Sequence, residues 1–134
     1  MSRYIYRPEI KPTDIDAFGH VNNEVYLRWL LEAATAHSDS LGYSTAKFVE
    51  LGAGFVVRRH ELEYLLPVFL KDEIKIETWS EFFEGAAGFR NYEIIHAKTE
   101  RKILTAKSKF VFVDLKSGRP MAIPEAIMRA FGHA

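Results

Sequence analysis

Six positions between residues 14 and 26 carry groups that could take part in acyl-transfer chemistry. They are Asp14, Asp16, His20, Asn22, Asn23 and Tyr26. Acyl transfer to water requires an activated water or a nucleophile, together with hydrogen-bond donors for the developing oxyanion. A carboxylate on a turn just before a helix supplies the first, and the unpaired backbone N–H groups of the helix N-terminus supply the second.

A helix is expected to begin directly after these residues. Asn22 or Asn23 can cap it by accepting a backbone N–H of the first turn, and Glu24 suits the positive end of the helix dipole. We predict a helix over residues 22–40 that ends before Gly42. Its apolar positions are too many for a single stripe, so we expect a curved sheet to bury most of its circumference.

The remaining elements are predicted from alternation of apolar residues and from turn-forming residues. We expect strands over about residues 3–12, 55–65, 73–83, 88–99 and 102–114, and short helices over about 44–51 and 124–131. Strands that follow one helix in a run indicate an α+β fold with an antiparallel sheet. A length of 134 residues is typical of one domain, so we expect residues 1–134 to form a single domain.

Composition excludes several functional classes. The chain has 18 Lys and Arg against 18 Asp and Glu, which argues against a general nucleic-acid binder. It has no cysteine, which excludes disulfides, a thiol nucleophile and thiolate metal sites, and its five histidines are too dispersed to suggest a metal. No window approaches the ~18 apolar residues of a membrane span, so we expect a cytoplasmic protein with no membrane partner.

The run TDIDAFGHVNNEVY at residues 13–26 resembles the signature of the hot-dog-fold thioesterases, in particular the 4-hydroxybenzoyl-CoA thioesterase-like branch. That signature is an Asp-x-Asp turn, a Gly, a short His-Val-Asn-Asn step and a Tyr on the central helix. The His-Val-Asn-Asn-x-x-Tyr spelling is similar to the plant acyl-carrier-protein thioesterases of the same superfamily. LEYLLP at 62–67 followed by KDEI at 71–74 resembles the family's junction between its second and third strands.

The resemblance implies a hot-dog fold, a curved antiparallel sheet wrapped around a long central helix, and it assigns roles to three residues. Asp16 becomes the catalytic carboxylate, acting either as general base or as nucleophile, and the backbone N–H of Asn23 becomes the oxyanion donor. His20 matches a functional histidine of the plant branch, but Phe18 stands where that branch has an Asn. A turn-capping role for Asp16 and a structural hydrogen bond for His20 are the alternatives, and for Asp14 a turn-capping role is expected.

Further residues are expected to contact substrate. Around the loop these are Val21, Asn22 and Tyr26, although for Tyr26 and Trp29 a place in the core is expected before one in the acyl pocket. For the phosphates of coenzyme A the candidates are Arg58, Arg59, Arg90 and Lys107. Where the family often carries basic residues, this chain has EFFEG at 81–85. That shortage of basic residues fits an acyl-carrier-protein substrate as well.

Three other polar residues are interpreted as structural. Glu32, on an apolar helix, is expected to be a buried and hydrogen-bonded carboxylate. His37, near the helix end, is expected to be a cation that suits the dipole. His60 is expected on a solvated or interface face. Residues 98–119 carry seven basic side chains against two acidic ones, which fits a solvated strand face or a local phosphate contact.

The sequence thus predicts an acyl-CoA thioesterase that uses no cofactor or metal. An acyl-carrier-protein thioesterase, a non-catalytic acyl-ligand-binding dimer and a hydratase or dehydratase using Asp16 with His20 are the alternatives. Because an open sheet edge must be covered or paired, and because the family pairs it, we expect a homodimer or homotetramer with the active site between subunits.

Overall fold

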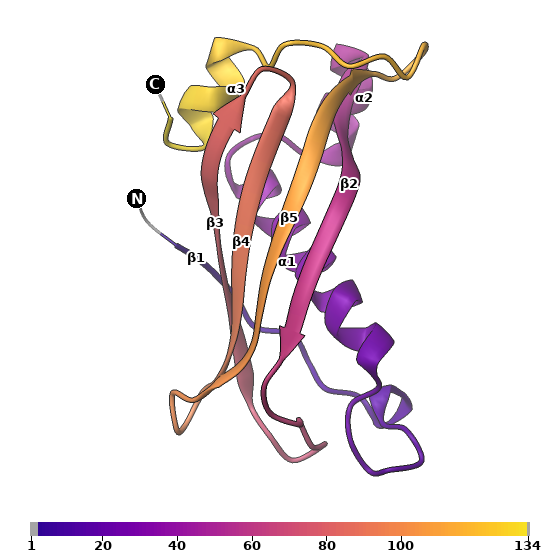
Figure 1. The fold of residues 1–134 in the computed structure, drawn as a ribbon, viewed down its shortest axis with the longest axis vertical. Helices are drawn as coiled ribbons and strands as arrows, with labels where there is room; N and C mark the ends of the chain where they lie inside the picture. The colour runs from indigo at the N-terminus through magenta and orange to yellow at the C-terminus, as the bar shows by residue number, and fades with distance from the viewer. Residues whose placement is uncertain (1–2, 134) are drawn as a thin grey trace.

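The computed structural model describes residues 3–133, and its framework is one antiparallel sheet packed on a long helix (Figure 1). The strands are β1 (Tyr4–Tyr6), β2 (Ala53–Tyr64), β3 (Ile74–Glu84), β4 (Ala87–His96) and β5 (Lys102–Asp114), in the order β1-β3-β4-β5-β2. The helices are α1 (Asn23–Ser40), α2 (Thr45–Leu51) and α3 (Glu125–Ala130), with a 3-10 turn η1 (Pro12–Asp14). The predicted α+β class, with an antiparallel sheet around one long helix, is confirmed.

Helix α1 begins where its capping residue predicts. Asn22 Oδ1 accepts a hydrogen bond from the N–H of Glu24 at 3.1 Å, which satisfies one orphan donor of the first turn. The helix ends at Ser40, and Gly42 follows with a φ of +88°, a left-handed conformation that glycine adopts without strain. Within residues 3–133, no helix is long and apolar enough to cross a membrane.

Only one face of α1 is buried in this chain. Its buried residues are Val25, Tyr26, Trp29, Leu30 and Ala33, which lie along one side of a helix. Leu31, by contrast, is 37% exposed. The prediction that most of the circumference would be buried is therefore wrong for the single chain, because the sheet covers α1 from one side only (Figure 1).

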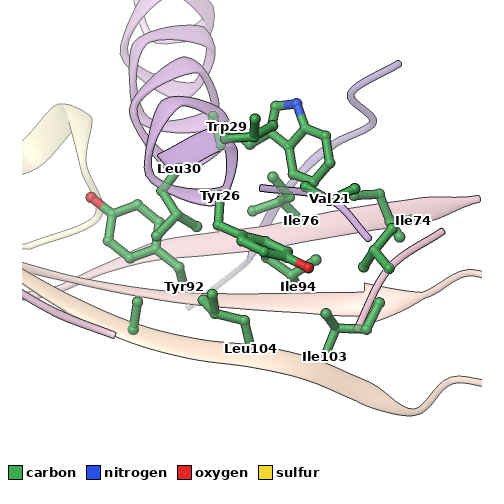
Figure 2. Close-up of a cluster of buried hydrophobic side chains, with 14 residues drawn as sticks. Val21, Tyr26, Trp29, Leu30, Ile74, Ile76, Tyr92, Ile94, Ile103 and Leu104 are labelled. Carbon is green, nitrogen blue, oxygen red and sulfur yellow. The ribbon is translucent and has the colours of Figure 1, made fainter. Parts of the chain in front are cut away.

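The buried face of α1 packs onto the middle of the sheet. Figure 2 shows Tyr26, Trp29 and Leu30 projecting from the helix toward side chains of β3, β4 and β5. The facing residues of this cluster include Ile74, Ile76, Tyr92, Ile94, Ile103 and Leu104. A smaller cluster of Ala53, Phe112, Ile123, Ile127 and Phe131 lies at the end of the sheet covered by α2 and α3.

The two outer strands differ in length. β1 pairs with β3 over only three residues, so the strand predicted over 3–12 is much shorter than expected. The physical reason is proline: Pro8 has no N–H to donate to a ladder, and Pro12 opens the 3-10 turn. β2 is 12 residues long and pairs with β5 alone, so its outer edge has no partner strand among the residues described.

Candidate active site

Asp16 lies at the head of a tight turn between η1 and α1. Its Oδ1 accepts the N–H of Phe18 at 2.9 Å, and its carbonyl oxygen accepts the N–H of Gly19 at 3.0 Å. Gly19 has a φ of +81°, which the turn requires and which glycine adopts freely. The turn-capping role therefore uses one carboxylate oxygen, while Oδ2 has no hydrogen-bond partner among residues 3–133.

Backbone hydrogen bonds fix this turn against the body of the protein. The N–H of Asp16 donates to the carbonyl of His20 at 2.8 Å, which closes the loop on itself. Val21 is 2% exposed, pairs with Ile15, and donates its N–H to the carbonyl of Val68 at 2.9 Å. The position of Asp16 relative to the start of α1 is consequently set by main-chain contacts.

Asp14 holds the same loop in place through three hydrogen bonds that it accepts. Its carboxylate is buried and accepts the N–H of Lys11 at 2.9 Å and Nη2 of Arg28 at 2.8 Å. Its carbonyl accepts the N–H of Asn22 at 2.9 Å. Burial alone would raise the pKa of Asp14, but the hydrogen bonds from Arg28 and Lys11 and the charge of Arg28 outweigh it and hold that pKa below its usual range.

The first N–H groups of α1 are partly used. Asn22 is exposed and its side chain serves Glu24, whereas the N–H of Asn23 has no acceptor among residues 3–133. Tyr64, at the end of β2, donates its hydroxyl to the carbonyl of Asn23 at 3.4 Å. The Asn23 N–H is therefore open to an oxygen of a ligand, with the dipole of α1 behind it.

The imidazole of His20 makes no hydrogen bond to any residue in 3–133. It packs edge-on against Phe69, with ring centroids 5.1 Å apart. The hydrogen bond that closes the turn is accepted by the backbone carbonyl of His20. The side-chain hydrogen bond predicted as the structural role of His20 is therefore absent within residues 3–133. Asp16 and His20 are likewise not joined by a hydrogen bond between their side chains within residues 3–133.

Phe69 also lines a hollow of about 690 Å³ beside the loop, together with Lys71 and Arg101. Arg101 belongs to the basic stretch 98–119, for which a local phosphate contact is one of the two expectations, whereas Lys71 is not among the predicted phosphate contacts. Lys71 is the first residue of the KDEI step at 71–74, which carries part of the resemblance and is therefore a local signal. Arg101 lies in the turn between β4 and β5, and only the fold brings it to this end of the molecule.

The remaining predicted contacts lie in different places. Tyr26 is 3% exposed and packs edge-on against Trp29 and Tyr64, as the core alternative predicts (Figure 2). Arg58 and Arg59 are exposed on the outer strand β2, and the structure does not bring them to the Asp16 turn with the other candidates. Lys107 is exposed on β5, and Arg90 is buried on β4.

For the polar residues on α1, the predicted burial of Glu32 and the predicted charge of His37 are wrong, whereas the predicted hydrogen bond of Glu32 is confirmed. The Glu32 side chain is 42% exposed and is held by the hydroxyl of Tyr6 at 3.1 Å, because it lies beside the edge of the buried stripe. His37 is not a cation at the end of α1. Burial, and then the charge of Arg90, lower the pKa of His37 to about 4, so its imidazole is neutral at pH 7.

Several known proteins are similar to this chain along most of its length. The sequence model of the thioesterase-like superfamily matches residues 10–131. Long-chain acyl-CoA thioesterase FadM of Escherichia coli strain K12 is 28% identical over 118 residues, which cover 86% of each chain. Acyl-acyl carrier protein thioesterase ATL3 of Arabidopsis thaliana is 24% identical over 125 residues, and the match spans 93% of this chain but 65% of ATL3.

The fold has close counterparts among solved structures. Slr0204, a 1,4-dihydroxy-2-naphthoyl-CoA thioesterase from Synechocystis, superposes with a TM-score of 0.89 at 17% identity, over 97% of this chain and 96% of the other. At 17% identity, this similarity supports the fold alone. The hot-dog fold and the thioesterase-like resemblance predicted from the loop sequence are confirmed.

The ion pair under the loop makes stability depend on pH. Because the pKa of Asp14 is lower in the folded state, its contribution is complete above the unfolded pKa near 3.8 and is lost as the pH falls through the folded pKa. We expect Arg28→Met to lower the free energy of unfolding by about 1 kcal/mol at pH 7, at the low end for a charged hydrogen bond because Arg28 is half exposed. The deficit should shrink below pH 3.8, as measured by urea unfolding.

The matched control is Arg129→Met, which removes an exposed ion pair with Glu125 on α3. We expect it to change the free energy of unfolding by less than about 0.5 kcal/mol at pH 7. An Arg28→Met deficit of the same size at pH 7 and pH 3 would show that packing, and not the Asp14 charge, is what Arg28 supplies.

Proposed function

Since this chain belongs to the thioesterase-like superfamily, we propose that it hydrolyses an acyl thioester, with acyl-CoA as substrate, to the free acid and CoA. The observation that carries the proposal is the unpaired N–H of Asn23 at the start of α1, directly after the turn that presents Asp16. The similarity to FadM, named a long-chain acyl-CoA thioesterase, supports the substrate class. The cytoplasmic location expected from the sequence stays a prediction.

In the proposed reaction, the carbonyl oxygen of the thioester accepts the N–H of Asn23, and the dipole of α1 stabilises the negative charge that develops there. Asp16 Oδ2 then acts in one of two ways. As a general base it takes a proton from a water whose oxygen attacks the carbonyl carbon. As a nucleophile it attacks that carbon itself, and water hydrolyses the resulting mixed anhydride. Both routes expel the CoA thiolate.

A second copy of the chain is proposed to complete the site. The open edge of β2 leaves unpaired backbone groups, and antiparallel pairing of two β2 strands across a two-fold axis would satisfy them. Such pairing sets the beginning of one β2 beside the end of the other. Tyr64, at the end of β2, contacts Asn23, whereas Phe55, at its beginning, lines a cavity at the other end of α1. The Asp16 turn of one subunit would thereby face that cavity of its partner.

The assembly predicts a defined mass in solution. Light scattering after size-exclusion chromatography should give twice the 15.4 kDa of one chain, or four times that mass if dimers pair further. A single-chain mass at micromolar concentration would overturn the shared site, because no second β2 would then cover the open edge.

An acyl-carrier-protein substrate is the second candidate. The similarity to ATL3, named an acyl-acyl carrier protein thioesterase, favours it. Both substrates present the same acyl thioester to Asp16 and Asn23. They differ in the group that carries the thiol, which is coenzyme A in one and the carrier protein in the other. Side-by-side assays with acyl-CoA and acyl-carrier-protein carrying one acyl group would decide between them, through the ratio of their kcat/KM values.

The role of Asp16 is tested by Asp16→Asn, measured as thiol release from short, medium, long and aryl acyl-CoAs. We expect kcat to fall at least ~100-fold, because the amide neither takes a proton nor attacks the carbonyl. Asp39→Asn, which alters an exposed aspartate near the other end of α1, is the matched control and should retain full activity. Turnover that is indifferent to Asp16→Asn would contradict the assignment, and binding without turnover in the wild type would favour the non-catalytic dimer.

The oxyanion donor is tested by removing one backbone N–H. Asn23 is the first residue of α1, where proline is well tolerated, and Asn22 precedes it with φ −63° and ψ 139°, which suits a residue before proline. We expect Asn23→Pro to lower kcat by about 10²–10³. Asn23→Ala keeps the N–H and should lower kcat by no more than a few-fold. Equal losses in the two variants would move the oxyanion donor away from Asn23.

A further inference from the structure

Arg90 is a buried cation that has no carboxylate partner in the part of the chain that the structure describes. It lies on β4 with 8% of its surface exposed, and it forms no ion pair with any residue in 3–133. Its Nη1 donates to Thr78 Oγ1 at 3.0 Å and to His37 Nδ1 at 2.9 Å. Buried charges in proteins are normally paired, because removing them from water is unfavourable.

The neighbours of Arg90 do not neutralise it. His37 is uncharged at pH 7 and accepts the hydrogen bond through Nδ1, while its ring stacks on Tyr4 and meets Phe131 edge-on. Burial lowers the pKa of Arg90, yet a guanidinium stays protonated in proteins. A full positive charge is therefore held among neutral groups.

The guanidinium borders a cavity of about 180 Å³ between the second half of α1, α2, α3 and the sheet. Half of the residues that line it are aromatic, among them Tyr43, Phe48, Phe55, Phe83 and Phe131, and the hydroxyl residues Thr35, Ser38, Thr45 and Ser80 line it as well. Arg90 has five N–H donors, and only those of Nη1 have partners among the residues described. Nε and Nη2 are thus free to bind a ligand in a space comparable to an engineered apolar cavity of about 150 Å³ that holds benzene.

We propose that this cavity binds a carboxylate carried on a compact apolar body, such as a phenyl ring or a short alkyl chain, with Arg90 as its counter-ion. A carboxylate matches the planar fork of a guanidinium through two parallel hydrogen bonds. The aromatic side chains that line the cavity would enclose the apolar body. Ligand binding then supplies the anion that the fold itself does not supply within residues 3–133.

If the protein hydrolyses acyl thioesters as proposed, on which this step rests, the carboxylate bound by Arg90 can come from two sources. In the proposed two-fold dimer the cavity would face Asn23 of the partner subunit. The acyl chain of a thioester whose carbonyl oxygen accepts that N–H would then extend toward Arg90. The carboxylate is then either a second acid group at the far end of the acyl chain, or the carboxylate of a released acid that binds again with that group turned toward Arg90. Both share the chemistry of an anion on an apolar body.

Binding is tested without any turnover. Titration calorimetry on the wild-type protein would compare benzoate with benzamide, and hexanoate with hexanamide. We expect each acid to bind at least about tenfold more tightly than its amide, because only the acid pairs with a charged partner. Arg90→Met should abolish the preference, whereas Arg119→Met, at an exposed arginine in the turn after β5, should retain it.

The outcomes against the proposal are equally definite. Equal binding of acid and amide in both pairs, binding of neither, or an unchanged preference in Arg90→Met would overturn it and leave Arg90 a structural partner of His37 and Thr78. If Arg90→Met does not fold, the acid–amide comparison in the wild type decides alone. Arg90→Lys keeps the charge without the fork, and an intermediate preference in it would support bidentate recognition.

The source of the carboxylate is tested by kinetics. If it belongs to the substrate, kcat/KM for adipoyl-CoA should exceed that for hexanoyl-CoA at least about tenfold, and Arg90→Met should remove that ratio. If it is the released acid, the calorimetric preference remains and the kinetic ratio is near one. Failure of every thioester to react would contradict the proposed function and leave the binding result standing.

Discussion

One buried carboxylate holds together the pieces of chain that form the candidate active site. The carboxylate of Asp14 accepts the N–H of Lys11 before it and the guanidinium of Arg28 one turn into α1, and the backbone carbonyl of Asp14 accepts the N–H of Asn22 after the loop. The Asp16 turn lies between these contacts and cannot shift without breaking one of them. The cation is what makes the buried carboxylate tolerable, since a buried carboxylate without a partner is strongly disfavoured.

The anchored loop places a carboxylate and an open helix N-terminus next to each other for a simple reason. The hydrogen bonds of the Asp16 turn end at His20, and Asn22 caps α1 through Glu24, so the N–H of Asn23 has no acceptor in the described part of the chain. A donor left unpaired by helix geometry is available at no cost in reorganisation. The arrangement combines the two requirements of thioester hydrolysis within eight residues of chain.

The apolar interior divides the molecule into two ends with different chemistry. The side chains around Trp29 and Leu30 fill the space between α1 and the middle of the sheet (Figure 2). Beyond them, toward α2 and α3, the interior contains Arg90, His37 and the cavity that Arg90 lines. Helices α2 and α3 lie at the opposite end of α1 from the loop (Figure 1). A single chain keeps these two ends apart, and the unpaired edge of β2 is the route by which a second chain would join them.

The sequence alone determined the features that depend on near neighbours in the chain. The start of α1, the turn at Asp16 and the succession of strands along the chain rest on capping, turn residues and alternation, which act over a few residues. The pairing of β2 with β5, in place of a simple meander, is a property of the tertiary structure. The resemblance carried by residues 13–26 added the fold and the assignment of Asp16 and Asn23. The tertiary structure decided the rest: the exposure of Glu32, the neutrality of His37, the burial of Arg90 and the arrival of Arg101 beside the loop. Each of these depends on desolvation or on contacts between distant segments, and neither is encoded in local spacing.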